Sequence, residues 1–195
     1  MVDRVVARLD RGERVAFATL GDPNVYSTFS SVAEGVASSR PTVKVSTVPG
    51  IMAFQELAAR SGTVLVDGDE RLVLIPAHRE VGAITATALA DPATAVVVYK
   101  GGRRVAELAA GAAAEGRLRG AVLGELLGLP GERVVPLTDA VADGRPVTYL
   151  STVIVPPHRE GSAANWAATE GAEATTAAAV PRSDQLGAEP SAGGS

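Results

Sequence analysis

The sequence contains no cysteine and only two histidines, His78 and His158, among its 195 residues. The absence of cysteine excludes disulfides, thiolate metal sites and a cysteine nucleophile, and it fits a reducing compartment. The histidines lie far apart and have no carboxylate at a useful spacing, so the sequence predicts neither a metal site nor a catalytic triad. We therefore expect a cytoplasmic protein without a metal centre.

Long hydrophobic runs and clusters of basic residues are also missing. The longest apolar runs, 94–99 and 147–155, have the length of strands and fall well short of the roughly 20 residues that a membrane-spanning helix needs. A formal net charge of −4 and the absence of a basic stripe argue against nucleic-acid binding. With 46% hydrophobic and 21% charged residues, the composition is typical of a soluble globular protein.

The most informative stretch is a junction between an apolar run, residues 15–20, and a helical pattern that opens after Gly21-Asp22-Pro23. The chain must turn there, because glycine permits unusual dihedrals and proline fixes φ while offering no N–H to a sheet. In open α/β sheets, ligands bind at such carboxyl ends of strands. An ordinary turn whose Ser27 and Thr28 hydroxyls cap the following helix explains the same residues.

The first third of the sequence alternates helices and strands, which favours βαβ crossovers and a parallel sheet. Hydrophobic periodicity and turn residues predict helices over 2–10, 29–37 and 52–60, and strands over 15–20 and 43–47. We assign these elements to an N-terminal α/β domain over residues 1–67.

After a connector near residues 61–70 the pattern changes, because strands follow one another without helices between the last of them. The expected strands are 71–76, 94–99, 119–125, 133–137 and 147–155, with helices near 80–90 and 103–115. This order predicts a mixed α+β domain over residues 68–156. Residues 157–195 are rich in Ala, Gly, Ser, Thr and Glu, and we expect them to be a disordered tail.

Two motifs give the chain a resemblance to a known family. Thr-Leu-Gly-Asp-Pro-x-x-Tyr-Ser-Thr-Phe at residues 19–29, followed by Val-Pro-Gly-Ile-Met-Ala at residues 48–53, resembles the tetrapyrrole (corrin/porphyrin) methylases. Within that family, the sequence of the motif at residues 19–29 is most similar to that of the precorrin-2 C(20)-methyltransferases. The resemblance runs from about residue 12 to 155 and implies a two-domain α/β fold that binds S-adenosylmethionine in the cleft between its domains, as a homodimer.

The same resemblance implies which residues contact the cofactor. The loop at residues 20–26 corresponds to the family's contact with the methionine part, and Tyr99 and Leu127 correspond to positions beside the adenosine. Met52 stands where the family has threonine, and inward packing of an apolar helix N-terminus is the alternative for it. Core packing accounts for Leu127 equally well. The implied cofactor-binding residues are Leu20, Gly21, Asp22, Val25, Tyr26, Ser27, Thr28, Met52, Ala53, Tyr99 and Leu127. Residues 136–138 and 149–152 are secondary candidates for the cavity wall.

The reaction implied by the resemblance is methyl transfer to carbon 20 of precorrin-2 in cobalamin biosynthesis. Asp22 and Tyr26 are candidate acceptors for the proton lost from that carbon, but no general base is assigned. Four arginines could steer the carboxylates of the tetrapyrrole, although ordinary solvated surface charges are the better explanation: Arg40, Arg79, Arg103 and Arg104.

Two alternatives stay open at this point. One is a methylase acting on another tetrapyrrole, and the other is a homologue that folds without activity. The second arises because the family's opening strand and its Gly-x-Gly-Pro-Gly-Asp loop would lie upstream of Met1. We therefore expect a truncated sequence, a fragment of a longer or fused methylase, or a degenerate copy.

Overall fold

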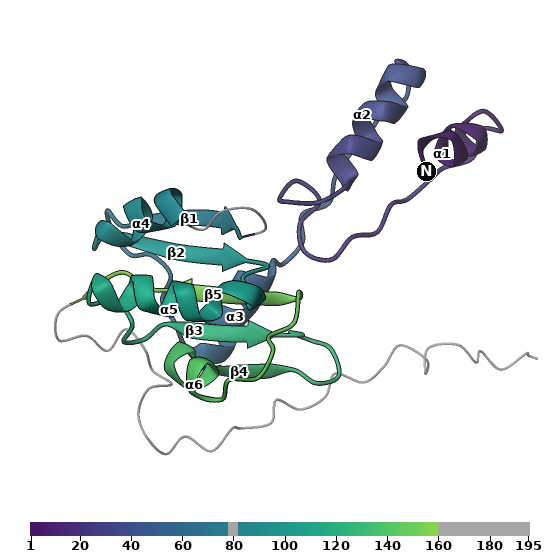
Figure 1. Ribbon diagram of the computed structural model, residues 1–195. Helices are drawn as coiled ribbons and strands as arrows, with labels where there is room; N and C mark the ends of the chain where they lie inside the picture. The colour runs from purple at the N-terminus through teal and green to yellow at the C-terminus, as the bar shows by residue number, and fades with distance from the viewer. Residues whose placement is uncertain (78–81, 160–195) are drawn as a thin grey trace, which may run out of the picture.

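A computed structural model of the chain describes residues 1–77 and 82–159. Figure 1 shows a sheet with helices on both faces and two further helices that stand apart from it. The elements are α1 (Val2–Leu9), α2 (Phe29–Ser39), α3 (Ala53–Ser61), β1 (Arg71–Pro76), α4 (Gly82–Ala90), β2 (Thr94–Tyr99), the 3₁₀ turn η1 (Gly102–Arg104), α5 (Val105–Ala114), β3 (Val122–Glu125), β4 (Arg133–Pro136), α6 (Leu137–Ala142) and β5 (Ser151–Val155).

The five strands form one mixed sheet in the order β1-β2-β5-β3-β4. β1 and β2 are parallel and are connected through α4, whereas the pairs β2–β5, β5–β3 and β3–β4 are antiparallel. The last strand in the chain therefore lies in the middle of the sheet, between β2 and β3. The α/β class and the mixed sheet expected from the sequence are confirmed.

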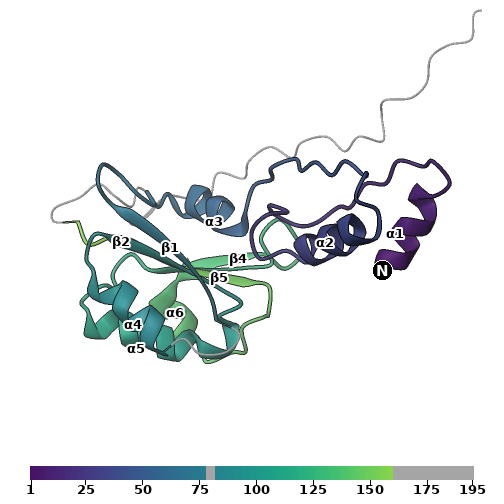
Figure 2. The ribbon, with the colours of Figure 1, turned by 90° about the horizontal axis from the view of Figure 1, so that it is seen from above.

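The central strands are buried on both faces, which explains why they read as continuous runs of β-branched residues. In β2, Val96 and Val98 pack into the cluster formed with α4, α5 and α6, while Val97 packs with α3 on the other face. Figure 2 shows α3 on the side of the sheet opposite α4, α5 and α6. β5 alternates in the same way, with Val153 and Ile154 on opposite faces.

The strands expected over 15–20 and 43–47 are wrong, and the parallel sheet of the expected N-terminal domain is not formed. A strand needs a neighbour for its backbone N–H and C=O groups. Within residues 1–77 and 82–159, neither run forms a backbone hydrogen bond with a strand, and Val15 and Val45 are exposed.

A helix was also missed between the last two strands. Residue 137 was assigned to a strand, but Leu137 begins α6, and its backbone N–H donates to Ala121 O at 2.8 Å. Leu137 and Ala140 are buried beneath the sheet, so α6 adds to the core. The expectation that no helix separates these strands is therefore wrong.

The first 52 residues, which we call the N-terminal arm, contain little core of their own. α1 has no buried residue, and Val36 is the buried residue of α2. The two helices pack where Gly35 leaves room for Val2, since a Cβ on Gly35 would lie 2.8 Å from Val2 Cγ2. The division at residue 67 remains a proposal, and α3, which precedes it, packs against β5.

The described chain ends in a segment that is held against the sheet. The His158 backbone N–H donates to Pro92 O at 2.8 Å, and the partly buried Arg159 pairs with Glu70. Residues 160–195 of the expected tail lie outside the described residues, as do His78 and Arg79. In the described part of the chain, no helix has the length and apolar character needed to cross a bilayer.

Candidate functional site

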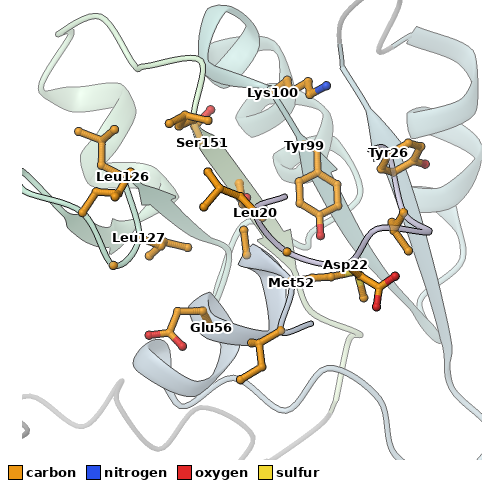
Figure 3. A pocket seen from close by; sticks show the side chains of 18 of the residues that line it. Leu20, Asp22, Tyr26, Met52, Glu56, Tyr99, Lys100, Leu126, Leu127 and Ser151 are labelled. Carbon is orange, nitrogen blue, oxygen red and sulfur yellow. The ribbon is translucent and has the colours of Figure 1, made fainter. Parts of the chain in front are cut away.

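A cavity of about 470 Å³ lies where the N-terminal arm meets one end of the sheet. Figure 3 shows side chains from the arm, α3, the end of β2 and the loop after β3 converging on it. Residues 149–150, which lead into β5, complete the lining of the cavity. The lining residues are Leu20, Gly21, Asp22, Val25, Tyr26, Ile51, Met52, Ala53, Glu56, Tyr99, Lys100, Leu126, Leu127, Gly128, Leu129, Tyr149, Leu150, Ser151 and Thr152.

Most residues that the sequence suggested for the site are brought together here. These are Leu20, Gly21, Asp22, Val25, Tyr26, Met52, Ala53, Tyr99 and Leu127, and the secondary candidates 149–152 join them. Ser27 and Thr28 do not line the cavity. The Ser27 hydroxyl accepts the Phe29 backbone N–H at 3.1 Å in a turn just before α2, while the N-cap residue Thr28 makes no side-chain cap.

Two loops of the arm interlock at the edge of the cavity. Gly21 adopts a φ of 73°, which favours glycine, and a Cβ on Gly50 would lie only 2.3 Å from Gly21 O. The Asp22 carboxylate joins the loops, because its two oxygens accept the backbone N–H groups of Asn24 at 2.8 Å and Gly50 at 3.1 Å. Bare backbone at Gly21 therefore faces the cavity in a fixed position.

Both candidate proton acceptors use their polar atoms to hold this loop. The backbone N–H groups of Asn24 and Gly50 lower the pKa of Asp22, so its carboxylate stays ionised and is a weak base. The Tyr26 hydroxyl donates to Leu74 O in β1 at 2.8 Å. The geometry thus gives Asp22 and Tyr26 positioning roles.

Backbone strain is concentrated around the cavity. Among described non-glycine residues, positive φ occurs at Tyr26, Lys100 and Leu126, and all three line the cavity. Such conformations cost about 1–2 kcal/mol each for residues with a Cβ, and they persist where surrounding structure enforces them. Here the Lys100 and Leu126 N–H groups donate to Ser151 O and Leu150 O, both at 3.0 Å. The start of β5 therefore fixes the neighbouring strand ends.

The wall beside β2 is aromatic. The Tyr99 ring lies 5.8 Å from Tyr26 and 6.4 Å from Phe54 in edge-on geometry. Burial raises the pKa of Tyr99 to about 12, so its phenol is neutral at physiological pH. Next to it, Lys100 Nζ lies 5.4 Å from the centroid of the Tyr149 ring, a cation–π arrangement that places a positive charge at the rim.

Several lining residues were not predicted as cofactor contacts, among them Ile51, Glu56 and Lys100. Glu56 could have been found from periodicity, because it lies one helical turn beyond Met52 and Ala53 and therefore on the same face of the helix. The other lining residues of the loop at 126–129 could be identified only once the fold was known.

Some other candidates lie elsewhere. Leu137, from the secondary candidates 136–138, is fully buried in the core beneath the sheet. Arg40 pairs with Asp10 at 2.7 Å on the arm. Arg104 is part of an ion pair with Glu107 at 2.9 Å. Core packing and surface ion pairing therefore account for these residues.

Comparison with known proteins assigns the family. The profile of the family described as "Tetrapyrrole (Corrin/Porphyrin) Methylases" matches residues 1–141. The chain belongs to this family. The resemblance carried by residues 19–29 and 48–53 is thereby confirmed.

Among the curated relatives of this methylase-family chain, one is named as a cobalamin biosynthesis protein and another as a cobalt-precorrin-2 methyltransferase. "Cobalamin biosynthesis protein CobIJ" of Mycobacterium bovis is 33% identical over 159 residues, which are 80% of this chain and 30% of the relative. "Cobalt-precorrin-2 C(20)-methyltransferase" of Salmonella typhimurium is 30% identical over 151 residues, 77% of this chain and 62% of the relative. The chain thus spans about one third to three fifths of the length of these relatives.

Solved structures support the family fold. Cobalt precorrin-4 methyltransferase CbiF matches with a TM-score of 0.61 at 15% identity, covering 80% of this chain and 69% of that protein. Uroporphyrin-III C-methyltransferase from Thermus thermophilus, solved in complex with S-adenosylhomocysteine, matches with a TM-score of 0.54 at 24% identity, covering 78% and 70%. The likeness to these two methylases is one of fold.

Proposed function

We propose that this chain binds S-adenosylmethionine in the cavity and transfers its methyl group to carbon 20 of precorrin-2 in cobalamin biosynthesis. The proposal rests on one observation: residues from the family motifs at 19–29 and 48–53, together with Tyr99, lie far apart in sequence yet line one cavity. The names of the curated relatives support the same pathway and the same carbon.

The residues present fit such a cofactor. The cavity volume of about 470 Å³ lies in the range of small-molecule sites, and its wall is mainly apolar with a few placed polar groups. Exposed backbone at Gly21 allows a close approach to the amino-acid end, and the flat ring of Tyr99 offers a stacking surface for a purine.

Methyl transfer of this kind needs positioning more than acid–base catalysis. The cofactor would supply an electrophilic methyl group on a sulfonium sulfur. The S–CH3 bond breaks as the tetrapyrrole carbon forms its C–CH3 bond, the sulfur leaves as a neutral thioether, and the carbon then releases its proton to solvent. The interlocked loops at Gly21 and Gly50 and the apolar wall would hold the reactants in line and exclude water. Alignment of this type is worth up to about 7–11 kcal/mol of the barrier.

Lys100 is placed where it could bind the tetrapyrrole substrate. Tetrapyrroles of this pathway carry several carboxylates, and Lys100 places a cation at the rim, held by the Tyr149 ring. Its positive charge would attract a substrate carboxylate and orient the macrocycle. The preference for precorrin-2 over another tetrapyrrole rests on the amino-acid sequence of residues 19–29 and on the names of the curated relatives.

Calorimetric titration of the purified chain with S-adenosylhomocysteine tests cofactor binding, and we expect a micromolar Kd. Incubation with precorrin-2 and S-adenosylmethionine should then give a product heavier by one methylene unit, with the label of a ¹³C-methyl donor at carbon 20. Labelling of a different tetrapyrrole in preference to precorrin-2 would refute the proposed substrate. The proposed homodimer is tested by sedimentation velocity.

A second candidate is a homologue that folds without activity. The observation that favours it is the pair of extended runs at 15–20 and 43–47, which lack strand partners within the described residues. An arm without its own sheet would hold the loop at Gly21 less rigidly. Folded protein that gives no heat with S-adenosylhomocysteine would support this second candidate and exclude the first.

A further inference from the structure

Glu56 is a cavity-lining carboxylate whose role the reaction described above leaves open. The other acidic residue in the lining, Asp22, uses both oxygens to accept backbone N–H groups. Glu56 uses one: its Oε1 accepts Arg60 Nε at 2.7 Å. Across the described chain its Oε2 has no hydrogen-bond partner, and the side chain is about 36% exposed. Glu56 therefore lines the cavity and keeps one carboxylate oxygen without a partner among the described residues.

A short chain of ion pairs holds Glu56 in place. Arg60 also contacts Glu132, with Arg60 Nη1 3.0 Å from Glu132 Oε1, and the other Glu132 oxygen accepts the Gly128 N–H at 2.6 Å. The network joins two lining segments, α3 and the loop after β3. Figure 3 shows Glu56 on α3 beneath Leu127 of that loop. The carboxylate is thus oriented before any ligand arrives, which reduces the entropy lost on binding.

The position of Glu56 relates it to one part of the ligand. The loop at residues 20–26, at the arm side of the cavity, is where the proposed function places the amino-acid end. Leu127, to whose loop Glu56 is tethered, lines the same cavity, and the family resemblance implies that its position lies beside the nucleoside. A free carboxylate oxygen accepts hydrogen bonds and cannot donate them, so it fits hydroxyl groups. Acidic side chains bind ribose hydroxyls in the same manner in dinucleotide-binding folds.

We propose that Glu56 binds the ribose hydroxyls of the cofactor's nucleoside through Oε2 and so determines specificity for a ribonucleoside. The inference rests on the proposed function and deepens it. A carboxylate that accepts from both hydroxyls would make charge-assisted bonds, which are stronger than neutral ones. Arg60 balances the charge of Glu56 while its own second contact keeps it on Glu132.

The test combines a change in the protein with a change in the ligand. Calorimetry would measure the Kd of S-adenosylhomocysteine and of its 2′,3′-dideoxy analogue for the wild-type chain, Glu56→Ala and Glu56→Gln. The matched control is Glu107→Ala, which removes a carboxylate of α5 that pairs with Arg104 and does not line the cavity. Each ratio of Kd values comes from a single protein, so altered stability of a variant does not affect it.

We expect the wild-type chain and Glu107→Ala to bind the dideoxy analogue about 10- to 100-fold more weakly, the range for a hydrogen bond to a charged group. In Glu56→Ala the ratio should fall to within about twofold, with Glu56→Gln between the two. A ratio in Glu56→Ala as large as in wild type would overturn the inference while leaving the proposed function intact. Failure of the wild-type chain to bind S-adenosylhomocysteine would instead refute both.

Discussion

The N-terminal arm and the sheet are held together by different forces. In the sheet, β2 and β5 are packed on both faces, and Val96, Val97 and Ile154 are fully buried. In the arm, α1 buries no residue, while Leu20, Val48 and Ile51 are among its exposed apolar side chains. Hydrophobic burial therefore stabilises the sheet, and the arm depends on a small number of polar and steric contacts.

The cavity lies where these two regions meet, and each contributes a different property. The sheet supplies fixed walls at Tyr99 and Leu126, whereas the arm supplies the loop with bare backbone at Gly21. The Tyr26–Leu74 hydrogen bond ties that loop to β1. Because a ligand between the regions contacts both, its binding should stabilise the arm more than the sheet.

The largest difference between the regions should appear in stability. Leu57 of α3 is fully buried against the sheet, and its Cδ1 would lie 2.9 Å from a Cβ on Gly124. Leu57→Ala should lower the free energy of unfolding by about 2–5 kcal/mol, as for other buried leucines. Urea denaturation followed by circular dichroism measures the loss.

The matched variant in the arm is Leu9→Ala, at a half-buried position of α1. We expect it to cost less than about 1 kcal/mol, because little apolar surface is lost. Equal losses for the two variants would contradict the distinction between arm and sheet.

A steric change at the interlocked loops should affect binding and spare the sheet. The Cβ introduced by Gly50→Ala would meet Gly21 O at 2.3 Å, and backbone cannot move aside as a flexible side chain can. We expect about 10- to 100-fold weaker binding of S-adenosylhomocysteine, corresponding to about 1–3 kcal/mol of strain. Calorimetry measures the Kd, and urea denaturation should show an unchanged main transition.

The control for this variant is Gly82→Ala, because a Cβ at Gly82 meets no atom within 4 Å. It should bind the ligand as the wild-type chain does. If Gly50→Ala also bound normally, the interlocking of the two loops would not matter for the cavity.

The same contrast explains what could be predicted from the sequence. The runs that became β1 and β2 were located correctly, and in the central strand β2 burial on both faces leaves a strong signal of β-branched residues. The runs at 15–20 and 43–47 carry a similar signal, yet no neighbouring strand pairs with them in the described chain. Strand formation depends on a partner, which local sequence does not record.

The site shows a comparable division. The resemblance of the sequence to the family identified the loop at residues 20–26 and also Met52, Ala53, Tyr99 and Leu127, and all of these contribute to one cavity. It could not identify Leu129, since that residue reaches the wall through the pairing of β3 with β4 and β5. The sequence left two roles open for Ser27, and its hydrogen bond to the Phe29 N–H favours a structural role in the turn before α2.

A smaller effect is expected from the contact that links the arm to the sheet. Tyr26→Phe removes the hydroxyl that donates to Leu74 O at 2.8 Å but keeps the ring against Tyr99. Loss of one such hydrogen bond costs about 1 kcal/mol, so S-adenosylhomocysteine should bind about fivefold more weakly. Tyr26→Leu, which also removes the ring, should weaken binding further. Identical affinities for wild type, Tyr26→Phe and Tyr26→Leu in calorimetry would show that the loop docks without this contact.

The smallest effect concerns the ionisation of Tyr99, on the sheet side of the cavity. Burial raises the pKa of Tyr99 from 10.0 to about 12. Because the folded-state pKa lies above the unfolded value, its contribution to stability is complete below about pH 10 and is lost as the pH rises through about 12. Ultraviolet titration near 295 nm of wild type and Tyr99→Phe should therefore differ by a phenolate that forms only near pH 12. If the difference spectrum instead developed near pH 10, the ring would be solvated, and the sheet side of the cavity would be as open as the arm side.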